Sequence, residues 1–157
     1  MNLDAVRRDD WLLGGVALLL VIDLLFLPWF DVSFGPISIT STATGAPDGW
    51  LGVLAVLAAV GLIADLAVER LSPQTQVPAV GGSRATTRLA LAGITALFVA
   101  LKFLFHVHFS LFGLGFWGAV VLTAVLVLLT AKARRGEAPV ISQPASSGPA
   151  GTAPPAA

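Results

Sequence analysis

Four long apolar runs, separated by polar segments, dominate the hydrophobic pattern of the chain. They cover residues 11–30, 50–68, 88–109 and 113–131. A helix needs about 20 mainly apolar residues to cross a hydrocarbon core about 30 Å thick, and each run is close to that length. The pattern predicts an all-α fold, a membrane-embedded four-helix bundle that occupies residues 11–135.

The connection between the first two runs, residues 31–49, is rich in Ser, Thr, Gly and Pro and lacks Lys and Arg. Apolar and polar residues alternate on both sides of Gly35 and Pro36, which is typical of a short hairpin, but Pro and Gly favour an irregular loop equally. Asp48 stands where the N-cap of the second helix is expected. The pattern leaves hairpin and loop as alternatives.

The two ends of the chain are polar. Residues 1–10 form a short segment, and we do not expect a signal peptide there, because the apolar run that follows is too long and no small-x-small cleavage pattern comes after it. Residues 136–157 consist mainly of Pro, Ala, Ser and Gly with a single charge. Such a composition predicts a disordered tail without core-forming residues.

The basic residues fix the expected orientation in a membrane. Of the nine Lys and Arg residues, eight lie in the N-terminal segment, in the middle connection with the helix start that follows it, or directly after the last run. The first and third connections have none. Since cytoplasmic loops carry an excess of Lys and Arg, both termini are predicted to be cytoplasmic. The eight residues are Arg7, Arg8, Arg70, Arg84, Arg88, Lys132, Arg134 and Arg135.

Composition excludes several classes of protein. Of 157 residues, 56% are hydrophobic and 11% charged, and the mean hydropathy of +0.88 is far from that of a soluble domain. The net charge is zero, which gives no electrostatic case for binding nucleic acid. The absence of cysteine excludes disulfides and thiolate metal sites. We expect one multi-pass domain in the cell membrane, with no soluble catalytic domain and no cofactor.

The third run carries a lysine, Lys102, where lipid tolerates charge poorly. Its twelve Leu, Ile, Phe and Val residues favour insertion by about 4 to 7 kcal/mol, against about 3 kcal/mol for a central lysine. Asp23 interrupts the first run, and both residues lie about six or seven positions short of the expected outer surface. One hypothesis is that Asp23 and Lys102 pair across the bundle, either as a pocket for a proton or small ligand or as a structural ion pair. The alternative is that the lysine snorkels outward.

Lys102 also belongs to a polar stripe on the third helix. Arg88, Thr95, Lys102 and His106 are spaced by seven, seven and four residues, so they share one helical face. We expect this face to turn toward neighbouring helices, as a packing seam or as a route for protons or ions. His106 and His108 point in nearly opposite directions on a helix, so no metal site is expected from them. Asp23, Lys102, Thr95 and His106 form the candidate intramembrane polar site.

A second group of charges lies where the second helix ends and the third begins. Asp65, Glu69 and Arg70 fall near the cytoplasmic end of the second helix, and Arg88 begins the third. Two consecutive antiparallel helices bring these positions to similar height. We therefore expect a contact between Asp65 and Arg88 that ties the two helices together at the cytoplasmic interface.

The sequence holds no motif that indicates catalysis. It lacks a phosphate-binding glycine loop, GxSxG, HExxH and any nucleic-acid-binding module. We therefore expect no enzymatic activity. The glycines and alanines of the runs suit helices that approach closely in lipid, among them Ala55 and Ala59, which are four residues apart.

The pattern resembles the uncharacterised small four-span integral membrane proteins common in high-GC actinobacteria. The resemblance is carried by spans rich in Ala, Val, Leu and Gly, by LPWF at the end of the first span, by GAPDGW before the second, and by the Pro/Ala tail. It covers residues 11–135 in architecture and implies no particular activity. The chain is also similar to small multidrug transporters in having an acid in its first helix, but its longer outer loop, its intramembrane lysine and its tail depart from them.

We interpret the chain as a non-enzymatic accessory or scaffold subunit that acts through helix association in the cytoplasmic membrane. Its expected partners are the lipid bilayer and a second copy or another membrane protein, with no nucleic acid. The alternative is a small proton- or ion-coupled transporter that uses Asp23 and Lys102.

Overall fold

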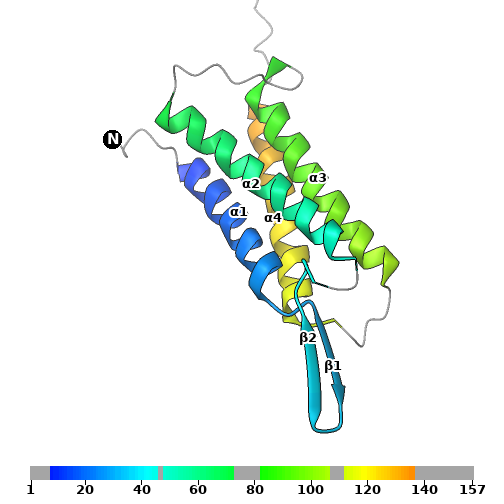
Figure 1. Ribbon diagram of the computed structural model, residues 1–157. Helices are drawn as coiled ribbons and strands as arrows, with labels where there is room; N and C mark the ends of the chain where they lie inside the picture. Colours follow the sequence, from blue (N-terminus) through cyan, green and yellow to red (C-terminus); the bar gives the residue numbers. More distant parts are fainter. Residues whose placement is uncertain (1–7, 46–47, 73–81, 107–111, 137–157) are drawn as a thin grey trace, which may run out of the picture.

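The computed structural model describes residues 8–45, 48–72, 82–106 and 112–136. These residues form four helices and one hairpin (Figure 1). The predicted tail from residue 137 onward, the first seven residues and His108 lie outside the described part, whereas Gly136 belongs to the last helix. The elements are α1 (Arg8–Phe26), β1 (Phe30–Phe34), β2 (Ile37–Ser41), α2 (Gly49–Leu71), α3 (Arg84–Phe105) and α4 (Leu114–Gly136).

The helices pack side by side in a ring in which α1 contacts α2 and α4, and α3 contacts the same two helices. Helices α1 and α3 therefore face each other across the diagonal. Alanines let the helices approach closely, because Ala17, Ala55, Ala59, Ala92 and Ala119 are all buried at the helix contacts. The mostly helical, four-helix prediction is confirmed, and the hairpin alternative holds for the first connection.

Helices α2, α3 and α4 are each long and apolar enough to cross a membrane. Helix α1 does not qualify by composition, because its 19 residues include Asp9, Asp10 and Asp23. Large apolar side chains cover the outside of the bundle, a surface compatible with lipid and unusual in a soluble monomer. They include Leu18, Leu19, Leu57, Leu97, Val121 and Leu128.

The helix ends differ from the expected ones for local reasons. Helix α1 ends at Phe26, four residues earlier than expected, because Pro28 has no N–H to continue the helix and Phe30 pairs in a strand. Helix α3 begins at Arg84, since the Ser83 hydroxyl accepts a hydrogen bond from the Thr86 N–H at 3.1 Å. Ser83 is therefore the N-cap residue of α3.

The hairpin projects beyond one end of the bundle (Figure 1). Its antiparallel register runs from Phe30 opposite Ser41 to Phe34 opposite Ile37. Gly35 turns the chain with a φ of +60°, the left-handed value that a two-residue hairpin turn requires at its first central position. We call residues 27–45 the cap, because this segment covers the end of the bundle where α1 ends and α2 begins.

Glycines allow the cap to pack directly against the helix ends. A methyl group at Gly52 would overlap the Ala43 carbonyl oxygen, and one at Gly113 would overlap the Pro28 carbonyl oxygen. The Gly115 N–H donates to the Pro28 carbonyl at 3.0 Å, and the Gly113 N–H donates to the Trp29 carbonyl at 2.8 Å. The backbone of the cap is thus bonded to the start of α4 and packed against the start of α2.

Candidate functional site

Lys102 lies under the cap with only 1% of its surface exposed. Its ammonium donates hydrogen bonds to the Ala43 carbonyl and, at 3.3 Å, to the Gly45 carbonyl. The Nζ atom also lies 5.8 Å from the ring centroids of both Trp29 and Phe30, a distance at which the face of a ring attracts a cation. Two backbone dipoles and two aromatic rings therefore surround the charge, and it does not snorkel.

Asp23 lies elsewhere, and among the described residues no ion pair joins it to Lys102. Its side chain is 3% exposed and packs on α4, where a methyl group at Gly118 would stand 2.6 Å from Oδ1. The Asp23 Oδ2 and Trp29 Nε1 atoms are both buried without a hydrogen-bond partner in the described part of the chain. The predicted Asp23–Lys102 pair is therefore wrong.

The ring order of the helices explains this correction. Asp23 belongs to α1 and Lys102 to α3, which face each other across the diagonal, so each side chain meets a nearer neighbour first. Asp23 contacts Gly118 on α4, and Lys102 reaches the carbonyls of the cap. Equal depth in the bundle did not suffice to bring the two charges together.

The polar stripe of α3 turns inward, as expected. Arg88, Thr95 and Lys102 are all buried, and the Thr95 hydroxyl donates to the Leu91 carbonyl at 2.9 Å, so it uses its own helix as partner. The fourth member, His106, is the C-cap of α3, and its Nε2 lies 3.6 Å from Asp48 Oδ2. Thr95 and His106 therefore lie on the same face as Lys102 but make no contact with its ammonium in the described structure.

Asp48 occupies the expected N-cap position of α2 without capping through its side chain. Its backbone is left-handed, with a φ of 49°, an uncommon conformation for a residue other than glycine. The carboxylate turns toward His106 at the end of α3. Asp48 thus connects the start of α2 to the end of α3.

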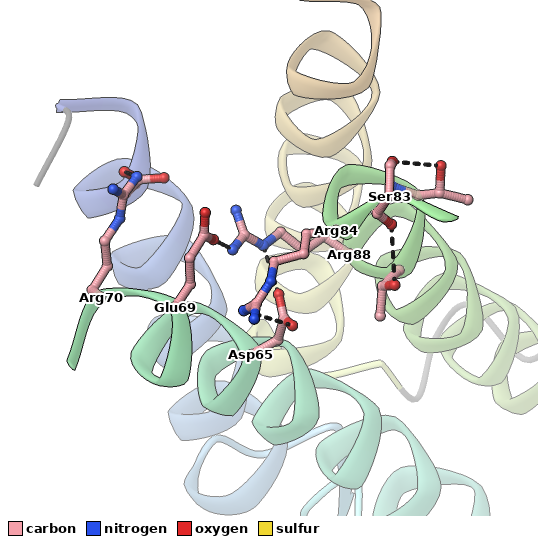
Figure 2. A network of polar contacts seen from close by, with 9 residues as sticks. Asp65, Glu69, Arg70, Ser83, Arg84 and Arg88 are labelled. Atoms are coloured by element: carbon pink, nitrogen blue, oxygen red, sulfur yellow. Dashed lines mark hydrogen bonds and ion pairs between the residues drawn. The ribbon is translucent and has the colours of Figure 1, made fainter. Parts of the chain in front are cut away.

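At the opposite end of the bundle, an ion-pair network joins α2 to α3 (Figure 2). The expected contact is present: Arg88 Nε donates to Asp65 Oδ2 at 2.8 Å. Arg88 also pairs with Glu69, and Arg84 Nη1 lies 3.8 Å from Asp65 Oδ1. Arg70 turns away from this group and pairs with Asp10 of α1. Asp65, Arg70 and Arg88 therefore tie three helices together.

Sequence reasoning missed an apolar groove between α3 and α4 with a volume of about 630 Å³. Ala96 and Ala100 of α3 and Ala124 of α4 contribute small side chains to its lining, while Trp117 and Leu128 are large and exposed. Thr123 also lines the groove and is 5% exposed, and its hydroxyl has no hydrogen-bond partner in the described structure. The four-residue spacing of Ala96 and Ala100 was the available signal.

We expect Lys102→Met to loosen the cap. The replacement keeps the length of the side chain but removes the donor to the Ala43 and Gly45 carbonyls, and bonds from a charged donor contribute about 1.5–3 kcal/mol each. The variant also avoids the free-energy cost of burying an ammonium group, which offsets part of the lost stability. Hydrogen exchange at the Gly45 amide, which donates to the Thr42 carbonyl at 3.1 Å, should accelerate about tenfold or more.

The matched control is Lys132→Met, since Lys132 is exposed at the other end of the bundle. It should leave exchange at Gly45 unchanged. Equal exchange in Lys102→Met and the unmodified protein would show that the ammonium does not hold the cap.

In comparisons with known proteins, no family model, curated protein or solved structure matches the chain.

Proposed function

We propose that the chain is a non-enzymatic accessory or scaffold subunit of the cytoplasmic membrane that binds a transmembrane helix of a second membrane protein. The docking surface is the groove between α3 and α4. The observation that carries this proposal is an apolar groove that is lined by small side chains and flanked by the large, exposed Trp117 and Leu128. Small side chains favour close approach of another helix in lipid.

Three features of the groove argue for a helix as its occupant. Ala96 and Ala100 form the small-xxx-small pattern that lets the backbone of a second helix come near. Trp117 and Leu128 stand exposed on α4 and supply large side chains for contact with an occupant. The apolar lining excludes a charged ligand, because a buried charge needs a partner.

The test is extraction from the native membrane in mild detergent, followed by native mass measurement of the unmodified protein and of Ala100→Leu. A leucine at this position fills the groove, and overpacking of about 1–3 kcal/mol corresponds to about 5- to 150-fold weaker association. Ala64→Leu is the matched control, because Ala64 is an exposed alanine on α2 outside the groove.

The proposal requires a second protein that is retained by the unmodified chain and by Ala64→Leu and lost from Ala100→Leu. A complex that contains only copies of this chain would show that the groove binds a second copy, and would overturn the proposal of a different membrane protein as partner. A strictly monomeric species, or a partner that Ala100→Leu retains, would overturn the role of the groove.

The proposed orientation places both chain ends and the α2–α3 connection in the cytoplasm. It is supported by the position of Arg70, Arg84, Arg88 and Lys132 at the end of the bundle opposite the cap. The competing function is a small proton- or ion-coupled transporter that uses Asp23 and Lys102. An ion pair between these two side chains does not support it, because none joins them in the described residues.

A further inference from the structure

A second cavity, of about 580 Å³, lies at the end of the bundle opposite the cap. Its volume falls within the range of about 300–1,000 Å³ that is typical of small-molecule sites. All four helices contribute to its lining, so it occupies the end of the bundle axis rather than one surface. Its charged side chains are Asp9, Asp10, Glu69, Arg70, Arg88 and Lys132.

The charges of this cavity balance, which argues against a ligand that is only anionic or only cationic. Three side chains are acidic and three are basic. Arg88 is already neutralised by Asp65 and Glu69, and one nitrogen of Arg70 pairs with Asp10. A ligand with separate positive and negative groups therefore matches the lining best.

Several polar groups remain available to such a ligand. The Arg70 side chain is 30% exposed, and its ion pair with Asp10 engages the Nη2 atom. Lys132 and Asp9 are exposed, and no ion pair with another described residue engages either of them. The site thus offers cations on α2 and α4 and a carboxylate on α1.

We propose that this cavity binds the headgroup of a phospholipid with a primary amine, a phosphoethanolamine group. The phosphate diester is bound by Arg70 and Lys132, and the ammonium by Asp9 with the outer face of Glu69. Leu13 and Leu129 also line the cavity and give the glycerol portion an apolar contact. The inference depends on the proposed membrane location, because that location puts this end of the bundle among lipid headgroups, but it does not depend on the α3–α4 groove.

The experiment measures lipid retention by native mass spectrometry on the delipidated full chain, incubated with three lipids that have identical acyl chains. Phosphatidylethanolamine has both the phosphate and three N–H donors, phosphatidylcholine has the same charges without N–H donors, and phosphatidylglycerol is anionic. We expect phosphatidylethanolamine to be retained about tenfold more than either of the others, because only its ammonium donates hydrogen bonds to carboxylates.

Two variants assign the preference to this cavity. Lys132→Gln and Asp9→Asn should each abolish most of the preference for phosphatidylethanolamine, and both residues are exposed, so folding is retained. Arg135→Gln is the matched control, since Arg135 is an exposed basic residue on α4 that does not line this cavity. It should leave the preference unchanged.

Four outcomes would overturn the proposal. Equal retention of the three lipids would indicate ordinary solvation by lipid, and stronger retention of phosphatidylglycerol would indicate a simple anion site. Soluble phosphoethanolamine is the final arm: if it displaces the lipid at equal concentration, the ligand is a soluble molecule with the same chemistry and the lipid source is wrong. A preference that survives Lys132→Gln and Asp9→Asn would likewise exclude this cavity.

Discussion

Gly52→Ala is expected to lower the free energy of unfolding in detergent by about 3 kcal/mol, at the upper end of the usual cost of overpacking. Gly52 is buried in the first turn of α2, directly beneath the cap. The added methyl group would overlap the Ala43 carbonyl oxygen and would also stand 2.9 Å from the Thr44 nitrogen. Both obstacles are backbone atoms, so no side-chain rotation relieves the overlap and the cap must move.

The movement should also disturb the Lys102 site, because the displaced carbonyl of Ala43 accepts a bond from the buried ammonium. Chemical or thermal unfolding of the purified protein gives the stability, and hydrogen exchange at Gly45 reports on the cap itself. We expect both measurements to change together in Gly52→Ala. A variant as stable as the unmodified protein, with unchanged exchange, would contradict the close packing of the cap on α2.

Gly61→Ala is the control on the same helix. A methyl group there meets only the side chain of Leu91, at 3.7 Å, which is an ordinary contact. Alanine is also the better helix former, by about 1 kcal/mol relative to glycine. The control should therefore be unchanged or slightly stabilised, which separates the overlap at Gly52 from a general effect of replacing helical glycines.

Much of the fold could be predicted because hydrophobic length is a direct property of the sequence. Each apolar run coincides with most of one helix, although Pro28 ends α1 early and Ser83 starts α3 early. The hairpin could not be separated from an irregular loop, because Gly35 and Pro36 suit both. The hairpin is established by the pairing of β1 with β2. This pairing is made by backbone groups, so the pattern of apolar and polar side chains does not predict it.

The two predicted ion pairs show what sequence can say about a helical bundle. Asp65 and Arg88 lie on consecutive antiparallel helices, which are neighbours in space, so equal height was enough to predict their contact. Asp23 and Lys102 lie on the first and third helices, and the rise along a helix gives depth but not the order of helices around the ring. Their pairing failed for that reason.

The partners of Lys102 could not have been read from the chain. They are the carbonyl oxygens of Ala43 and Gly45, and every residue carries a carbonyl, so nothing in the side-chain pattern marks these two. The polar stripe through Arg88, Thr95 and Lys102 did predict which face turns inward. The side-chain pattern thus predicted that Lys102 points inward, but it did not predict that carbonyl groups of the cap accept its hydrogen bonds.

The second large effect is expected for Trp29→Ala, which should lower the free energy of unfolding by about 3–5 kcal/mol, the usual cost of removing a buried large aromatic side chain. Trp29 is 1% exposed, and its ring meets Phe116 edge to face at a centroid distance of 5.6 Å. The backbone N–H of Trp29 donates to the Ser41 carbonyl at 2.8 Å. The side chain therefore fills the space between the cap and α4 where the backbone is already fixed.

Trp29→Ala also removes one of the two rings beside the Lys102 ammonium. Trp29→Phe should recover most of the stability, since it keeps an aromatic ring in the same space, and Trp50→Ala is the control because Trp50 is 55% exposed. Exposed positions usually change stability by within about 0.5 kcal/mol. If Trp29→Ala and Trp50→Ala unfold at the same denaturant concentration, Trp29 is not the side chain that joins the cap to the bundle, and the closed environment of Lys102 must be held by the backbone contacts of Gly52, Gly113 and Gly115 alone.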